Sequence, residues 1–253
     1  SAKANHIKKH ANAFVSPIVI SIDNKVFALD SQNGSSKWVH VGVPEITSML
    51  GSSSVAVDEN VVIVPYSSGS IFALNLKTGK PIWSENIIRG ESRLTLSSFN
   101  DVSRPIVDRG MVFAVGLGGK MMALDLKKGS RIWTKNISAQ ANPWVAGDYL
   151  YLISQDNELL ALTRDKGLIR WITPLPVYEN NKKGGKKIVW TGPVLASDRL
   201  VLVSSLGKML AISPYTGKML GIISLTSGTF VEPVLADSTL LVLTTDGKLS
   251  AYH

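Results

Sequence analysis

The 253-residue chain contains no cysteine and only four histidines. The absence of cysteine excludes disulfides, zinc–thiolate sites and thiol nucleophiles, and it leaves the redox compartment undecided. His6 and His10 have the i, i+4 spacing of a helical metal pair, but they lie in a lysine-rich stretch without a nearby carboxylate. We interpret that stretch as a solvated segment. We therefore predict no catalytic residue, no cofactor and no metal ligand.

Long apolar runs and capped helical segments are also missing from the sequence. Because a membrane-spanning helix needs about 20 consecutive apolar residues, we do not expect an integral membrane protein. No secretory leader is visible at Ser1, so we expect a mature or trimmed chain. The glycine-rich stretch Gly116–Lys120 is similar to a phosphate-binding loop, but it connects two predicted strands and is better explained as a hairpin.

The formal net charge is +8, yet the lysines are scattered over turns throughout the chain. One cluster stands out, consisting of Lys182, Lys183, Lys186 and Lys187. A solvated loop is the simplest interpretation, with contact to an anionic lipid or phosphate as the alternative. Aromatic side chains do not alternate with these lysines, so we predict no nucleic-acid partner.

The dominant feature of the sequence is a repeated motif. An alanine within an apolar strand is followed six residues later by glycine and ten residues later by tryptophan. The repeat alanines are Ala28, Ala73, Ala123, Ala161, Ala211 and Ala251, with spacings of 45, 50, 38, 50 and 40 residues. Propeller blades of four antiparallel strands have repeats of about this length. The pattern predicts an all-β fold, a β-propeller of four-stranded antiparallel blades, with six repeat signatures in this chain.

The third copy allows the strands of one blade to be predicted individually. Its strands are expected at Arg104–Val107, Met111–Val115, Met121–Asp125 and Arg131–Lys135, with glycine-containing turns between them. The second strands of four blades are apolar without alternation, which predicts burial on both faces. These strands are Val61–Val64, Met111–Val115, Leu200–Val203 and Leu240–Leu243.

The periodic tryptophans are Trp38, Trp83, Trp133 and Trp171. A flat indole ring can stack on a quinone, so a cofactor platform is one possible role. Their recurrence at one position of each outer strand instead favours packing between neighbouring blades. The fifth copy has Gly221 at this position, so that blade must be closed differently.

The repeat resembles the one shared by pyrroloquinoline-quinone dehydrogenases and the BamB family, which comprises periplasmic lipoprotein propellers of the outer-membrane β-barrel assembly machinery. The stretches 99–133 and 230–253 resemble BamB, and several phrases are most similar to its α-proteobacterial branch. The dehydrogenases use acidic calcium ligands and commonly a vicinal cysteine pair, and this chain lacks cysteine. The resemblance therefore implies the BamB family.

BamB propellers have eight blades, whereas this chain shows six signatures. We expect a single β-propeller domain over residues 1–253 that lacks about two N-terminal blades. A fragment, missing intervening residues and a six-bladed ring remain as explanations, and residues 11–15 could supply the closing strand in each case.

The resemblance also implies which loops bind a partner. In the family, loops on one rim contact the periplasmic domains of the barrel-assembly outer-membrane protein. The family's Leu-Ser-Leu-Arg loop falls on Thr47, Ser48, Met49 and Leu50, and its Asp-Val-Asp loop falls on Asp101, Val102 and Ser103. Leu50 replaces the family arginine and Ser103 replaces the second aspartate. We predict partner binding by Thr47, Met49, Leu50, Asp101 and Ser103, although Asp101 could also be a turn or capping residue, and Met49 and Leu50 could be packed within the loop.

The resemblance implies a non-enzymatic scaffold in the periplasm, associated with the outer membrane through a lipid anchor that this chain lacks. Nascent outer-membrane proteins are a further candidate partner. A quinoprotein dehydrogenase remains as one alternative, and it would need acidic metal ligands converging on the central channel. A propeller that binds polysaccharide or peptide is another, and it would need exposed aromatic residues at the channel mouth.

Overall fold

The computed structural model describes residues 16–21, 23–42, 54–87, 102–116, 119–139, 142–179 and 184–253. The partner-binding candidates Thr47, Met49, Leu50 and Asp101 lie outside these ranges. Every regular element in the described ranges is a β-strand, so the all-β prediction is confirmed. No helix long and apolar enough to cross a bilayer occurs among the described residues.

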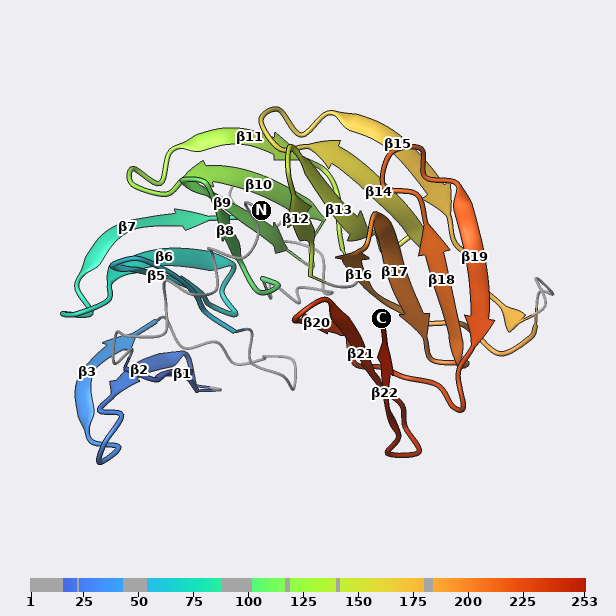
Figure 1. Cartoon of the computed structure of the whole chain (residues 1–253). Helices are drawn as coiled ribbons and strands as arrows, with labels where there is room; N and C mark the ends of the chain where they lie inside the picture. Colours follow the sequence, from blue (N-terminus) through green and yellow to red (C-terminus); the bar gives the residue numbers. More distant parts are fainter. Residues whose placement is uncertain are drawn as a thin grey trace.

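The strands form six sheets that lie side by side in an arc (Figure 1). We number the sheets as blades in chain order; blade 1 consists of β1 (Ile18–Ile20), β2 (Lys25–Leu29) and β3 (Ser36–Val41), and blade 2 consists of β4 (Ala56–Asp58), β5 (Val61–Pro65), β6 (Ser70–Asn75) and β7 (Pro81–Asn86). Blade 3 consists of β8 (Ile106–Asp108), β9 (Met111–Gly116), β10 (Lys120–Asp125) and β11 (Arg131–Lys135), and blade 4 consists of β12 (Trp144–Ala146), β13 (Tyr149–Ile153), β14 (Glu158–Thr163) and β15 (Ile169–Pro174). Blade 5 consists of β16 (Trp190–Ala196), β17 (Arg199–Ser204), β18 (Lys208–Ile212) and β19 (Met219–Ser224), and blade 6 consists of β20 (Val234–Ala236), β21 (Thr239–Leu243) and β22 (Leu249–Tyr252).

Each blade is an antiparallel meander in which strands adjacent in sequence are hydrogen-bonded. Blades 2 to 5 have four strands, as predicted from the repeat. Blade 1 contains the counterparts of the second to fourth strands, and blade 6 contains those of the first to third. This assignment follows from Ala28 in β2 and Ala251 in β22, which both occupy the third-strand position of the repeat.

Two sequence predictions about strands need correction. The first strand of blade 3 begins at Ile106, two residues later than predicted, because Pro105 has no N–H to donate to the neighbouring strand. The backbone N–H of Arg104 instead bonds to a side chain outside the sheet. The expected burial of both faces holds for β5, β9 and β17 but is wrong for β21, where Leu243 is 45% exposed. No described blade covers the outer face of blade 6.

The hydrophobic core consists of five clusters, and each cluster joins two consecutive blades. Between blades 3 and 4, for example, Phe113 and Val115 of β9 pack with Leu150 and Leu152 of β13. This arrangement explains the continuous apolar second strands, because both faces of an internal blade contact a neighbour.

The repeat alanine and tryptophan form a cross-strand pair in each of blades 1 to 4. The register pairs Ala28 with Trp38, and the same pairing recurs in the next three blades. A shift in register directly follows the alanine in each case, which is typical of a β-bulge. The small alanine side chain is completely buried, while the indole opposite it projects toward the following blade.

Each of these indoles is hydrogen-bonded to the following blade. The Nε1 atoms of Trp38, Trp83, Trp133 and Trp171 donate to the carbonyl oxygens of Leu76, Leu126, Arg164 and Pro214 at 2.8 to 3.1 Å. The rings also lie against the repeat glycines Gly79, Gly129, Gly167 and Gly217 of those blades. The four indoles thus lie between neighbouring blades, in contact with both.

The Asp or Asn that ends the third strand explains the turn leading to the repeat glycine. The Oδ1 atom of Asn75 accepts hydrogen bonds from the backbone N–H groups of Lys77 and Thr78. Asp125 accepts equivalent bonds from Lys127 and Lys128. Such Asx turns fix the chain reversal locally, and the glycine that follows adopts positive φ, +68° at Gly79.

Candidate rim and channel-mouth site

The connections between strands alternate between two rims because each blade is a meander. Loops that join one blade to the next leave from the same rim as the hairpins between second and third strands. Residues 43–53 and 88–101, which contain most of the predicted partner-binding positions, fall between blades 1 and 2 and between blades 2 and 3 in the chain and lie outside the described residues. We call this side the linker rim.

Ser103 is the predicted partner-binding residue that the structure describes. Its backbone N–H donates to the carbonyl oxygen of Val115 at 2.8 Å, and Val102 forms an isolated bridge with Gly116. Its hydroxyl oxygen is buried and has no hydrogen-bond partner among the residues that the structure describes. These bonds fix the backbone of Val102 and Ser103 against β9, where the described residues of blade 3 begin.

A polar network links three blades at the mouth of the central channel. The backbone N–H of Arg104 donates to Oδ1 of Asn142 at 3.2 Å. The backbone N–H and the side-chain amide of Asn142 donate to Oε1 of Glu232 at 3.3 and 3.2 Å. Arg104 precedes blade 3, Asn142 precedes blade 4 and Glu232 precedes blade 6. The network therefore connects segments that lie on opposite sides of blade 5 in sequence.

A cavity of about 620 Å³ lies next to this network. Its walls come from the innermost strands β4, β8 and β12, with apolar side chains such as Val57, Ile106 and Trp144. Arg104, Asp108, Asn142 and Glu232 contribute its polar lining. Both charge signs are present, so the cavity shows no clear preference for an anionic or a cationic ligand.

The sequence predictions missed Arg104, Asn142 and Glu232, although a signal was available. Each of the three residues directly precedes a proline at the start of a blade. Proline restricts the preceding residue to extended backbone, so the polar side chain is held at the same position in each blade. In blade 5 this position is occupied by Gly192, which precedes Pro193.

An aromatic cluster supports the start of the 43–53 loop. The Nδ1 atom of His40 lies 2.5 Å from the Tyr66 hydroxyl, and both rings contact Phe72. Burial lowers the pKa of the His40 imidazole and raises the pKa of the Tyr66 hydroxyl. Gly42 packs on this cluster so closely that a Cβ atom would lie 2.6 Å from the Tyr66 ring. The backbone leading into the loop is thus fixed by packing.

The opposite rim carries an ion-pair network between blades 3 and 4. Asp108 contacts Nε of Arg109 at 3.0 Å and Nη1 of Arg164 at 3.2 Å, and Arg109 also reaches Asp148 at 3.4 Å. Arg164 is also the residue whose carbonyl accepts the indole N–H of Trp133. These charges on the opposite rim contribute to blade packing.

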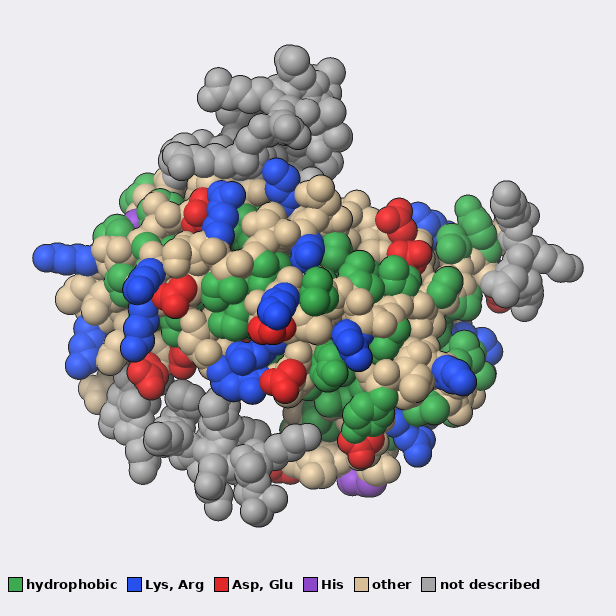
Figure 2. Space-filling model, turned by 90° about the horizontal axis from the view of Figure 1, so that it is seen from above, with side chains coloured by type: hydrophobic (Ala, Val, Ile, Leu, Met, Phe, Trp, Pro, Cys, Tyr) green, Lys and Arg blue, Asp and Glu red, His purple; other side chains and the backbone are tan. Residues whose placement is uncertain are grey.

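Charges of both signs are interspersed with apolar side chains on the face seen in Figure 2. The net charge of +8 therefore does not produce a continuous basic surface on this face. Among the described residues, no group of three or more His, Cys, Asp or Glu side chains is placed to hold a metal ion.

Comparison with known proteins identifies relatives that cover most of this chain. The family model described as "Outer membrane protein assembly factor BamB" matches residues 4–173. A protein of that name from Legionella pneumophila (strain Paris) is 30% identical over 210 residues, covering 83% of this chain and 52% of the relative. The chain spans about half the length of the curated relatives it matches.

Solved structures agree on the fold. The crystal structure of BamB from Moraxella catarrhalis superposes with a TM-score of 0.80 at 20% identity, covering 94% of this chain and 69% of that one. A quinohemoprotein alcohol dehydrogenase from Comamonas testosteroni gives a TM-score of 0.62 at 16% identity, covering 93% of this chain and 44% of the enzyme. At these identities the likenesses establish a shared propeller fold.

Proposed function

The chain belongs to the BamB family of outer membrane protein assembly factors, and we propose that it is an accessory scaffold in outer-membrane protein assembly and not an enzyme. The observation that carries this proposal is the match of the BamB family model to residues 4–173. The quinoprotein alternative has support from fold similarity alone, because the dehydrogenase relative is 16% identical.

The proposed partner is the periplasmic part of the barrel-assembly outer-membrane protein, and the proposed docking surface is the linker rim. Thr47, Met49, Leu50, Asp101 and Ser103 are the candidate contacts. Two observations support this choice. The aromatic cluster around Tyr66 fixes Gly42, and a backbone hydrogen bond fixes Ser103, so a described residue next to each candidate segment is held in place. A loop whose ends are fixed loses less conformational entropy when it binds.

The proposed setting is the periplasm, with attachment to the outer membrane through a lipid on a segment outside this chain. We further propose that a single propeller domain with about two additional N-terminal blades forms the functional unit. The length of the relatives supports this proposal, since the chain covers 52% of the Legionella protein. Nascent outer-membrane proteins are proposed as a second class of partner.

The test is capture of the full chain by the purified periplasmic domains of its cognate barrel-assembly protein. Asp101→Arg would replace attraction by repulsion if a basic group faces Asp101, and like charges in an interface can cost several kcal/mol. The double variant Met49→Glu with Leu50→Glu would place unpaired charges in an apolar contact. Both variants should weaken capture, while an exposed loop substitution should change folding stability by no more than about 0.5 kcal/mol.

Asp165→Arg is the matched control, because this exposed aspartate lies in a turn on the opposite rim. It introduces the same change of charge and should leave capture unchanged. Circular dichroism checks that every variant is folded. Equal capture of both linker-rim variants and the parent chain would show that the partner binds elsewhere.

A further inference from the structure

The connection between blades 4 and 5 forms two antiparallel arms on the linker rim. Tyr178 and Lys187 make an isolated antiparallel bridge. Next to this bridge, the backbone N–H of Glu179 donates to the carbonyl oxygen of Lys186 at 2.9 Å. We call the arms, residues 176–179 and 184–188, the linker hairpin; residues 180–183 lie outside the described residues. The hydrogen bonds between the arms make the linker hairpin an ordered element.

A cleft of about 300 Å³ lies between the linker hairpin and blade 5, and we call it the hairpin cleft. The Nε1 atom of Trp190, whose ring is buried at its base, donates to the carbonyl oxygen of Pro176 at 2.8 Å. Apolar side chains of the linker hairpin and of blade 5 form the walls, namely Pro176, Tyr178, Ile188, Leu206 and Ile222. Ligand sites usually have volumes of about 300 to 1,000 Å³, so the hairpin cleft can take one small group or chain.

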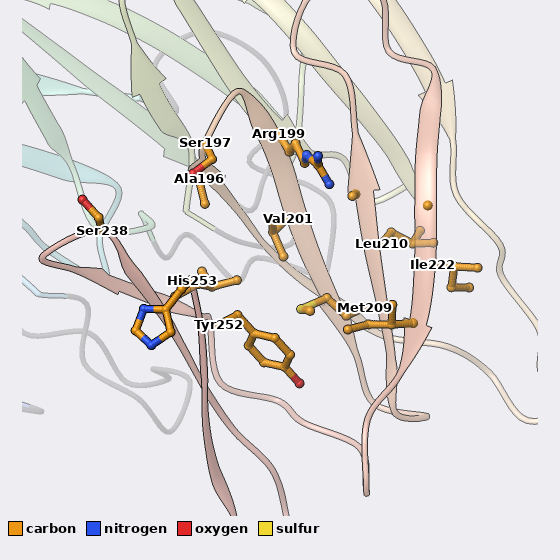
Figure 3. Close-up of a pocket in the computed structure, with 14 residues that line it drawn as sticks. Ala196, Ser197, Arg199, Val201, Met209, Leu210, Ile222, Ser238, Tyr252 and His253 are labelled. Atoms are coloured by element: carbon orange, nitrogen blue, oxygen red, sulfur yellow. The ribbon is translucent and has the colours of Figure 1, made fainter.

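The hairpin cleft belongs to the junction between blades 4 and 5, and both blades have four described strands. Met209 and Leu210 are neighbours on β18, and Ile222 lies on the adjacent β19 (Figure 3). Met209 packs in the cluster shared with blade 6, whereas Leu210 packs in the cluster shared with blade 4. Ile222 is the cross-strand partner of Leu210, so it shares the face directed toward blade 4.

Lysines are placed around the hairpin cleft. Lys208 of blade 5 lines it. Lys187 is the cross-strand partner of Tyr178, which places its side chain on the same face as the tyrosine ring. Lys186, Lys187 and Lys208 are exposed, and none of them forms an ion pair with a described carboxylate. Glu179 is the one acidic residue among the described residues that line the hairpin cleft, so positive charge prevails.

The backbone groups around the hairpin cleft are already hydrogen-bonded to one another. The N–H of Ile188 donates to the carbonyl oxygen of Val177 at 2.8 Å. Val189 and Ser205 exchange two bonds at 2.9 and 3.0 Å, one of them through the serine hydroxyl. A polypeptide in the cleft would leave its own backbone groups unpaired, which costs free energy. An acyl chain has no polar groups to satisfy, and nearby lysines suit an anionic headgroup.

We propose that the hairpin cleft binds an anionic phospholipid. An acyl chain would lie against Tyr178 and Ile222, and the headgroup phosphate would lie near Lys187 and Lys208. Apolar side chains bordered by lysines are typical of surfaces that contact a membrane interface. The inference rests on the junction between blades 4 and 5 and is independent of the partner proposed for the 43–53 and 88–101 segments.

Co-sedimentation of the full chain with lipid vesicles tests the proposal. Vesicles of phosphatidylglycerol mixed with phosphatidylcholine should sediment the parent chain, and vesicles of phosphatidylcholine alone should not. The double variant Lys186→Gln with Lys187→Gln should bind about 30-fold more weakly, since each lysine near an anionic surface contributes about a factor of five. Glu179→Gln removes the carboxylate from the cleft and should strengthen binding by about fivefold.

The matched control is Lys127→Gln with Lys128→Gln, which removes two exposed lysines from a turn on the opposite rim. It lowers the net charge equally and should leave the affinity unchanged. Ile222→Asp should weaken binding by about tenfold, because a carboxylate replaces apolar contact area. Its control is Ile132→Asp, since both isoleucines lie on outer strands and are 54% and 44% exposed. Circular dichroism checks that every variant is folded.

Four results would overturn the proposal. The first is equal sedimentation with the two kinds of vesicle. The second is equal weakening by the two double lysine variants, which would show that net charge alone governs binding. The third is parent-like binding of Ile222→Asp together with displacement by inorganic phosphate, which would identify a site for free phosphate. The fourth is tighter binding of a glutamate-rich peptide than of the vesicles, which would identify an acidic polypeptide as the occupant.

Discussion

The indole of Trp83 lies directly against the backbone of Gly129 in the next blade, where a Cβ atom would come within 2.5 Å of Cδ2 of the ring. Gly129 also has φ of +69°. Two separate constraints therefore require glycine at this position: the backbone conformation and the contact with the ring. The same pair of constraints recurs at Gly79, Gly167 and Gly217.

The two constraints predict a large cost for Gly129→Ala. A non-glycine residue at positive φ costs about 1 kcal/mol or slightly more, and overpacking adds about 1 to 3 kcal/mol. Gly110→Ala is the control, because Gly110 has φ of +75° but nothing within 4 Å of its Cβ position. Chemical denaturation should give a loss of about 1 kcal/mol for Gly110→Ala and clearly more for Gly129→Ala.

The contact itself can be measured with a double-mutant cycle. Trp83→Ala should destabilise the protein by about 3 to 5 kcal/mol because it leaves a gap between blades 2 and 3. In this background Gly129→Ala should cost about as much as Gly110→Ala, because the ring that causes the clash is gone. Additive free energies in the cycle would contradict the proposed clash.

His40 predicts a dependence of folding stability on pH. Burial lowers its pKa in the folded protein below the ordinary value of 6.5, so the unfolded chain binds the proton more readily. The stability contribution is complete above about pH 6.5 and is lost as the pH falls from there through the folded-state pKa. The melting temperature should therefore decrease less between pH 7 and pH 5 in His40→Phe than in the parent.

The control for this titration is His253→Asn, which removes an exposed histidine from the C-terminus. It should keep the pH dependence of the parent. Identical pH profiles for His40→Phe and the parent would show that His40 protonation is not linked to folding.

The channel-mouth network predicts a measurable contribution from Asn142. Asn142→Ala removes the acceptor of the Arg104 N–H and one donor to Glu232. Loss of such hydrogen bonds should lower the unfolding free energy by about 1 to 3 kcal/mol. Glu232→Gln, which keeps the acceptor oxygen but removes the charge, should cost less. Glu179→Gln, at an exposed position, serves as the control and should have no effect.

The repeat spacing predicted most of the fold, because alanine, glycine and tryptophan each recur at a position that one blade defines internally. The last strand of blade 3, Arg131–Lys135, has the predicted boundaries. The start of β8 was missed because Pro105 has no N–H to donate, which the sequence does show, and because the N–H of Arg104 bonds to Asn142, which lies 38 residues further along the chain. Strand propensity carries no information about such a partner.

Local sequence patterns also could not predict which residue each tryptophan contacts in the next blade. Glycines in the repeat were explained by their turns alone, whereas the structure adds contact with the ring of the preceding blade. The channel-mouth residues show the opposite case, since a polar residue followed by proline recurs at the start of three blades. Comparing equivalent positions across the repeats would have found Arg104, Asn142 and Glu232.

The succession of indole contacts makes the arc a one-dimensional chain of coupled units. In such a chain, stability is approximately a sum over the units and their nearest-neighbour couplings, and opening spreads inward from a weakly coupled end. Four junctions of this chain carry an indole, and the junction at Gly221 does not. Blade 6 should therefore fray first, with amide hydrogens of β21 exchanging before those of β9 although both are second strands.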